Sequence, residues 1–118
     1  MSERDELYLD HVLQAIARIE RYTASGRDAF FSDDMVQSAV IRQLEIVGEA
    51  ARNLSEQLKA SETAVPWRDI AGTRDRLIHG YFSVKLEIVW NVVVNELPLL
   101  KQQVQRILDQ FRERTSGQ

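Results

Sequence analysis

Apolar residues recur at steps of three and four over two long stretches of the chain, and this spacing most limits how it can fold. Such steps follow the 3.6-residue turn of an α-helix, so each stretch places its apolar side chains along one helix face. The first stretch consists of Val36, Val40, Leu44, Val47, Ala51, Leu54 and Leu58, and the second of Val89, Val93, Leu97, Leu100, Val104, Ile107 and Phe111. A chain with two such faces has to bury them against other helices, which favours a helical bundle.

A shorter stripe with the same spacing lies nearer the N-terminus and consists of Leu9, Val12, Ile16, Ile19 and Thr23. Four helices are predicted from these three faces and from the residues that interrupt them. They cover roughly residues 5–24, 32–58, 66 to about 79 or 80, and 84–113. Ser32 is the expected N-cap of the second helix, and Pro66 suits the first turn of the third. Because Pro98 lies inside the last helix, we expect that helix to be kinked or to divide near Glu96. The predicted fold class is therefore all-α, an antiparallel bundle of four to five helices.

Three local features refine this prediction. A glycine in a helix interior costs on the order of 1 kcal/mol relative to alanine, so Gly48 suggests a close backbone approach from another helix. The polar segment 59–66 reads as a link between the second and third helices. Residues 112–118 are expected to form a frayed tail.

Length and composition fit one globular domain over residues 1–118. Five Gly and two Pro are too few for the many turns of a β-sandwich or barrel. With no Cys, a disulfide framework and a thiolate metal site are both excluded. The charged N-terminal residues do not resemble a signal peptide, and no apolar run approaches the length of a membrane span. We therefore expect a cytoplasmic protein without a membrane partner.

Charge and chemistry concentrate in one short segment. The formal net charge is −3, so the whole molecule does not attract polyanions, but residues 66–86 hold four basic and only two acidic residues. Candidate functional residues gather within this window: Arg74, Asp75, Arg76, His79 and Tyr81. If the segment is helical, Asp75 and Arg76 lie one turn from His79.

An arginine and a histidine together suit cleavage of a phosphodiester. The guanidinium of Arg74 matches phosphate oxygens, and an imidazole with a pKa of about 6.5 exchanges protons at neutral pH. With RNA as substrate, His79 can take the proton of the 2′-hydroxyl, whose oxygen then attacks the adjacent phosphorus. Since one histidine does not readily serve as base and acid in the same step, we expect a two-fold homodimer that brings two copies of the motif together. Neither a metal nor another cofactor is expected.

The segment Arg74-Asp75-x-x-x-His79-x-Tyr81 resembles the R-x4-H-x-Y motif of the HEPN superfamily, and its HepT-like branch in particular. The resemblance extends to residues 43–50, to residues 66–72 and to the valine-rich helix after the motif. It implies a helical bundle that dimerises with its motifs at a shared cleft. It also implies a metal-independent ribonuclease toxin of a type II toxin–antitoxin pair, whose antitoxin is a small nucleotidyltransferase.

The same resemblance assigns a role to each motif residue. Arg74 and His79 correspond to the catalytic pair, and Asp75 to the polar residue that commonly follows the arginine. Tyr81 corresponds to the tyrosine that the antitoxin blocks by adding AMP. Arg76, beside them, is a candidate auxiliary residue. Added phosphate charge at Tyr81 is expected to repel an RNA phosphate and to obstruct the cleft.

Simpler interpretations of these residues remain open at the level of sequence. Arg74 and Arg76 can form a solvated face paired with Asp69 and Asp75, and His79 can cap a helix end. Two other functions are also possible for the whole chain: a non-catalytic helical module that dimerises and binds a partner, or an accessory subunit of a nucleotidyltransferase.

Residues outside the motif are interpreted more conservatively. Trp67 and Trp90 are expected to pack in the core or in a dimer contact rather than stack on bases. Glu45 and Glu49 are four residues apart and can face a cleft, although a solvated or ion-paired state is the simpler expectation. His11 is expected at the surface.

Overall fold

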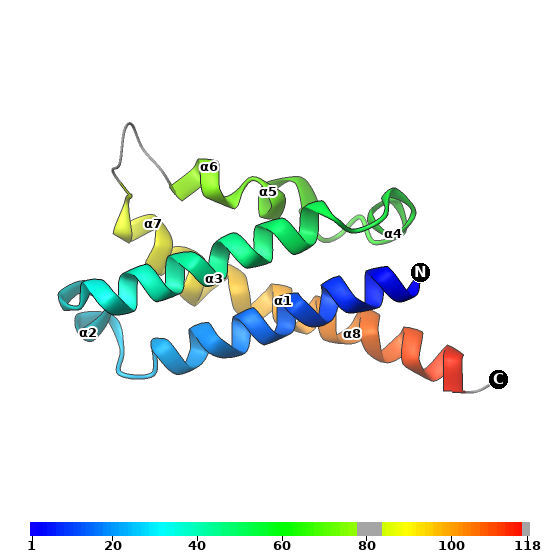
Figure 1. Cartoon of the computed structure of the whole chain (residues 1–118), viewed down its shortest axis with the longest axis horizontal. Coiled ribbons are helices and arrows are strands. Elements are labelled where there is room, and N and C mark those ends of the chain that lie inside the picture. The colour runs from blue at the N-terminus through cyan, green and yellow to red at the C-terminus, as the bar shows by residue number, and fades with distance from the viewer. Residues whose placement is uncertain (78–83, 117–118) are drawn as a thin grey trace.

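The computed structural model describes residues 1–77 and 84–116, and over these ranges the chain is helical with short connections (Figure 1). The elements are α1 (Glu3–Tyr22), α2 (Arg27–Ser32), α3 (Asp34–Arg52), α4 (Glu56–Ser61), α5 (Trp67–Ala71), α6 (Thr73–Leu77), α7 (Leu86–Asn91), the π-helical turn η1 (Val92–Glu96) and α8 (Leu97–Ser116). The predicted all-α fold class is confirmed. None of the described helices has the length and apolarity that crossing a membrane requires.

Three long helical segments build the bundle. Figure 1 shows α1 running antiparallel to α3, with α7, η1 and α8 following one another behind them and α5 and α6 lying along α3. The apolar faces predicted from the sequence are buried in one cluster, to which the long helices contribute Leu9, Val12, Ile16, Ile19, Val40, Leu44, Val47, Ala51, Val104 and Ile107. Burial of these faces supplies the main driving force for folding.

The start of α1 is fixed by a buried carboxylate. Ser2 and Asp5 form a reciprocal capping box, with the Asp5 N–H donating to Ser2 Oγ at 3.1 Å. Asp5 is only 1% exposed, and its carboxylate also accepts bonds from Ser55 N and Ser55 Oγ at 2.8 and 2.7 Å. Burial acts to raise the pKa of Asp5, but the hydrogen bonds from Ser55 and Ser2 outweigh it and lower that pKa. The network ties the beginning of α1 to the beginning of α4.

The second predicted helix, 32–58, was wrong at both ends. Its N-cap is Asp33, whose side chain accepts from the backbone of Met35 and Val36, and the short α2 precedes it. The helix ends at Arg52, and the side chain of its C-cap residue, Asn53, donates to the Glu49 carbonyl at 2.9 Å. Residues 56–58 were expected to belong to the second helix and residues 59–61 to the polar link, but together they form the short helix α4.

The third predicted helix, from 66 to about 79, is broken in two at Gly72. The close approach expected at Gly48 is confirmed, since a Cβ there would lie 3.1 Å from the Ile70 oxygen. The predicted end of this helix lies outside the described residues. The next helix was predicted to begin at residue 84 with Ser83 as its N-cap, and this was wrong, because α7 begins at Leu86 with Lys85 as its N-cap.

The last helix passes through Pro98 by means of the wide turn η1. Within this turn the Leu97 N–H donates to the Val92 carbonyl, five residues back, in place of the usual four. The predicted irregularity near Glu96 is therefore confirmed as a π-turn. The predicted frayed tail was wrong for residues 112–116, because α8 continues to Ser116, with Arg112 paired to Glu6 of α1 at 3.0 Å. Residues 117 and 118 lie outside the described residues.

Candidate active site

The short helix α6 presents two arginines to different surroundings. Arg74 is exposed and lines a groove, whereas Arg76 lines a separate pocket on the side of α7 to α8. Among the described residues, neither Arg74 nor Asp75 makes a side-chain hydrogen bond or ion pair. The alternative in which Arg74 pairs with Asp69 or Asp75 is therefore not supported by any contact among the described residues.

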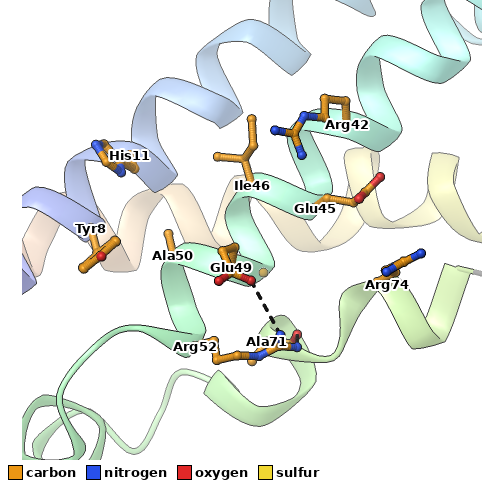
Figure 2. A pocket seen from close by; sticks show the side chains of 11 residues that line it. Tyr8, His11, Arg42, Glu45, Ile46, Glu49, Ala50, Arg52, Ala71 and Arg74 are labelled. Atoms are coloured by element: carbon orange, nitrogen blue, oxygen red, sulfur yellow. Dashed lines mark hydrogen bonds and ion pairs between the residues drawn. The ribbon is translucent and has the colours of Figure 1, made fainter.

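The groove that contains Arg74 has a volume of about 370 Å³. Helix α3 forms its floor, α1 forms one wall, and α5 and α6 form the other (Figure 2). The lining residues are Tyr8, His11, Arg42, Glu45, Ile46, Gly48, Glu49, Ala50, Arg52, Ala71 and Arg74. Arg74 thus lines a hollow that also carries charged side chains of α3 and has room for a small part of a ligand.

Four charged residues succeed one another along the floor. Arg42, Glu45, Glu49 and Arg52 are spaced by three, four and three residues, so they share one face of α3. Glu49 pairs with Arg52 at 3.6 Å, while Arg42 and Glu45 make no side-chain bond to any other described residue. Figure 2 shows Glu45 on the side of α3 that looks toward Arg74.

Three contacts fix the backbone just before Arg74. Gly48 allows the α5 backbone to lie against α3, and Arg52 Nη2 donates to the Ala71 carbonyl at 3.1 Å. The Thr73 hydroxyl, which is buried, donates to the Ile70 carbonyl. Because these contacts hold residues 70–73, they determine the direction in which α6 leaves the bundle.

Arg76 is held in an ion pair. Its Nη1 and Nη2 donate to Glu96 Oε1 and Oε2 at 3.0 and 2.8 Å, which makes the pair bidentate. Hydrogen bonding to Glu96 raises the pKa of Arg76, against the opposing effect of burial. The sequence allowed Arg76 to be ion-paired with Asp69 or Asp75. Arg76 is indeed ion-paired, but its partner is Glu96 of η1.

His79 and Tyr81 lie outside the described residues, so their predicted positions beside Arg74 remain predictions. The described residues on either side of that segment are well anchored. Leu77 is 1% exposed, and its carbonyl accepts a bond from the Lys85 N–H at 3.1 Å.

The structure adds groove residues that sequence reasoning missed or undervalued. Arg42 and Arg52 were not predicted, although their spacing from Glu45 and Glu49 places all four on one helix face. His11 is half-buried and packs edge to face against Tyr8 at 5.8 Å, in place of the simple surface position expected for it. Over residues 1–77 and 84–116, no three His, Cys, Asp or Glu side chains are grouped so that they could hold a metal ion.

The two tryptophans pack as expected. Trp67 is buried and donates from Nε1 to the Glu62 carbonyl at 3.0 Å. Trp90 stacks at a tilt on Phe30, with 5.2 Å between the ring centroids. Both rings serve the core.

The fold is an all-α bundle in which the arginine of the sequence motif, Arg74, lies beside a groove. Comparison with known sequences identifies the family that shares this sequence. The family described as Ribonuclease HepT-like matches residues 12–107, and the chain belongs to this family. A protein of Caldanaerobacter subterraneus subsp. tengcongensis named "Putative RNase TTE0752" is 42% identical, over 86% of this chain and 91% of its own length.

Two other relatives are similar to a comparable degree. A protein of Thermococcus cleftensis named "Probable ribonuclease HepT" is 39% identical, over 85% of this chain and 92% of its own length. One from Methanocaldococcus jannaschii, named "Gamma-glutamylcyclotransferase and putative RNase MJ0434", is 40% identical over 90% of this chain but only 48% of its own length. No solved structure matches the chain.

Proposed function

We propose that this protein is an RNA endonuclease that works without a metal ion and uses Arg74 and His79 as its catalytic residues. The observation that carries the proposal is the exposed Arg74 guanidinium, which has no partner among the described residues and stands at the rim of the groove. Membership of the ribonuclease HepT-like family supports the choice of RNA as substrate.

The reaction is derived from the chemistry of the two side chains. The imidazole of His79 takes the proton of the 2′-hydroxyl, and the resulting oxygen attacks the neighbouring phosphorus. The bond from phosphorus to the 5′-oxygen breaks, which leaves a 2′,3′-cyclic phosphate on one product and a 5′-hydroxyl on the other. Arg74 stabilises the negative charge that builds up on the non-bridging oxygens.

The departing 5′-oxygen also needs a proton. A second copy of His79, from the other subunit of a two-fold homodimer, is the proposed donor. Light scattering tests this part, with a dimer as the expected species. An active enzyme that stays monomeric at assay concentration contradicts it.

In the cell we propose the role of a cytoplasmic toxin held in check by a nucleotidyltransferase antitoxin. That enzyme transfers AMP from ATP to the Tyr81 hydroxyl oxygen with release of pyrophosphate, which places bulk and negative charge beside the site. The resemblance of the Arg74 to Tyr81 segment to the HepT-like motif supports this regulation.

An RNA cleavage assay in excess chelator tests the catalytic proposal. The wild-type protein is expected to cut single-stranded RNA into products with cyclic phosphate ends, and His79→Ala is expected to be inactive. DNA of the same sequence is the matched control, because it lacks the attacking hydroxyl. If wild type and variant are both inert and neither slows growth on expression, a non-catalytic partner-binding module replaces this proposal.

Regulation at Tyr81 is tested separately. Incubation with the candidate nucleotidyltransferase and ATP is expected to add one adenylyl group to the peptide containing Tyr81 and to stop RNA cleavage, while Tyr81→Phe stays unmodified. A modified protein that still cuts RNA at the original rate contradicts control through this tyrosine.

A further inference from the structure

The turn η1 places a carboxylate against the motif helix. Glu96, its last residue, contacts both terminal nitrogens of the Arg76 guanidinium at 3.0 and 2.8 Å. Residues 76 and 96 are twenty apart in sequence, so the pair joins two elements that no short loop connects. Among the described residues, α6 is joined to the rest of the bundle by this one bidentate ion pair.

The width of η1 explains why Glu96 reaches α6. Pro98 has no N–H, so the ordinary helical bond from residue 98 to residue 94 is missing. The helix widens before the proline into a π-turn, which holds one residue more than an α-turn. Compared with a regular helix of the same residues, this turn changes the rotation of α8 relative to α7. With Val92 and Leu97 both buried, Glu96 is left on the side that faces Arg76.

Helix α6 has few other means of fixing its rotation about its own axis. It is five residues long, it comes directly after the break at Gly72, and Thr73 and Leu77 are its buried residues. Arg74 and Arg76 are two positions apart and therefore project to opposite sides. Any rotation that frees Arg76 from Glu96 also turns Arg74 relative to the groove.

We propose that the pair of Arg76 and Glu96 is a positioning clamp, which holds α6 in the rotation that points Arg74 at the bound phosphate. This inference rests on the proposed ribonuclease function. It gives Arg76 a role different from that of a direct RNA contact, because its charge is neutralised by a bidentate carboxylate and adds little attraction for phosphate.

Exchanging the two charges tests the clamp. Arg76→Glu and Glu96→Arg each break the pair, and each is expected to lower kcat about tenfold with KM nearly unchanged, since misorientation of a catalytic group slows the chemical step. The double variant R76E/E96R rebuilds the pair in reverse and is expected to regain most of the lost rate. An RNA contact at Arg76 would instead raise KM in Arg76→Glu, and the double variant would not recover.

Hydrogen exchange gives a second readout that does not depend on activity. The amides of α6 are expected to exchange faster in each single variant and to return toward wild type in the double variant. If the wild-type protein cuts no RNA, the ribonuclease proposal fails while this measurement still decides the clamp. Unchanged exchange in both single variants overturns the clamp, whatever the activity.

A matched control comes from another ion pair of the bundle. Lys101 of α8 pairs with Glu20 of α1 at 3.0 Å and does not involve α6. Exchanging these two charges is expected to leave kcat, KM and the exchange of α6 unchanged. If this exchange lowers kcat as much as Arg76→Glu does, the effect at Arg76 is one of general charge disruption and the clamp is rejected.

Discussion

The hairpin of α1 and α3 and the segment of α5 and α6 are built on different principles. The hairpin helices have 20 and 19 residues, side-chain N-caps at both starts, and continuous apolar faces. The two helices of the motif segment have five residues each and are separated by Gly72. Local sequence pattern thus specifies the hairpin, whereas contacts from Gly48, Arg52 and Glu96 shape the segment that carries Arg74.

This difference separates stability from activity. Substitutions within the hairpin, away from its contacts with α5 and α6, should change the free energy of unfolding and leave the cleavage rate of folded protein alone. Substitutions around α6 should do the reverse. Single variants in each region, and two where the regions meet, show whether that division holds.

The largest expected effect is on activity. Arg74→Ala should lower kcat by about 100-fold or more, because it removes a charged donor from the developing negative charge. Its melting temperature should stay close to that of wild type, since the side chain is exposed and makes no bond to the described residues. Arg74→Lys, which keeps the charge without the planar fork, should lie between the two. A large loss of melting temperature in Arg74→Ala contradicts the division.

The hairpin should show the opposite response at Asp5. Asp5→Ala removes a buried acceptor of bonds from Ser55 and Ser2, and should destabilise the protein by about 2 to 3 kcal/mol in urea unfolding. Cleavage by the folded variant, measured well below its melting temperature, should match wild type. A loss of kcat at full folding would show that the hairpin and the site are coupled.

The stabilisation from Asp5 should also depend on pH. The folded pKa of Asp5 lies below its ordinary value of 3.8, so its stabilising contribution is complete above that value and is lost as the pH falls through the folded pKa. The difference in unfolding free energy between wild type and Asp5→Asn should therefore shrink below pH 3.8. A difference that grows as the pH falls contradicts the direction of the shift.

Gly48 lies where the two regions meet. Gly48→Val should push α5 away from α3, because a Cβ added there would lie 3.1 Å from the Ile70 oxygen, and should cost about 1 to 3 kcal/mol. It should also lower the cleavage rate, since α6 continues from α5. Ser38→Val, at an exposed position of the same helix, controls for the helix propensity of valine. Equal effects of the two substitutions would show that the close contact does not matter.

The smallest effect is expected at Arg52. Arg52→Ala loses the bond to the Ala71 carbonyl and should lower kcat only a few-fold, with stability within about 0.5 kcal/mol of wild type. Arg114→Ala removes another exposed arginine that donates to a backbone carbonyl, on α8, and should change neither. If both variants are as active as wild type, Arg52 does not help to place α6.

The sequence predicted the elements whose spacing repeats and missed those that depend on distant partners. The apolar faces of α1, α3 and α8 were predicted because Leu44 and Val104 lie on a regular helical period. The end of α3 at Arg52 depends on Asn53 capping the helix and on Asp5 holding Ser55, fifty residues away. No local pattern reveals such a contact.

The same limit applies to the site. Arg74 was predicted from the chemistry of its neighbours in sequence, and it does line a groove. The groove itself was not predictable, because α1, α3 and α6 meet there only in the folded chain. Arg76 illustrates the point, since its partner Glu96 becomes available only through the π-turn.

The wide turn depends more on how many residues lie between Val92 and Glu96 than on which residues they are. Deleting one of the three consecutive valines would hardly alter the apolar character of the stretch, yet it would return the turn to regular α-helical winding. Because the wide turn absorbs one extra residue, this deletion would keep the two sides in nearly the same orientation, whereas regular winding of all five residues would rotate one side by about 100° relative to the other. This stretch should therefore accept the loss of one valine, or its exchange for another branched apolar residue, far more readily than the insertion of a residue.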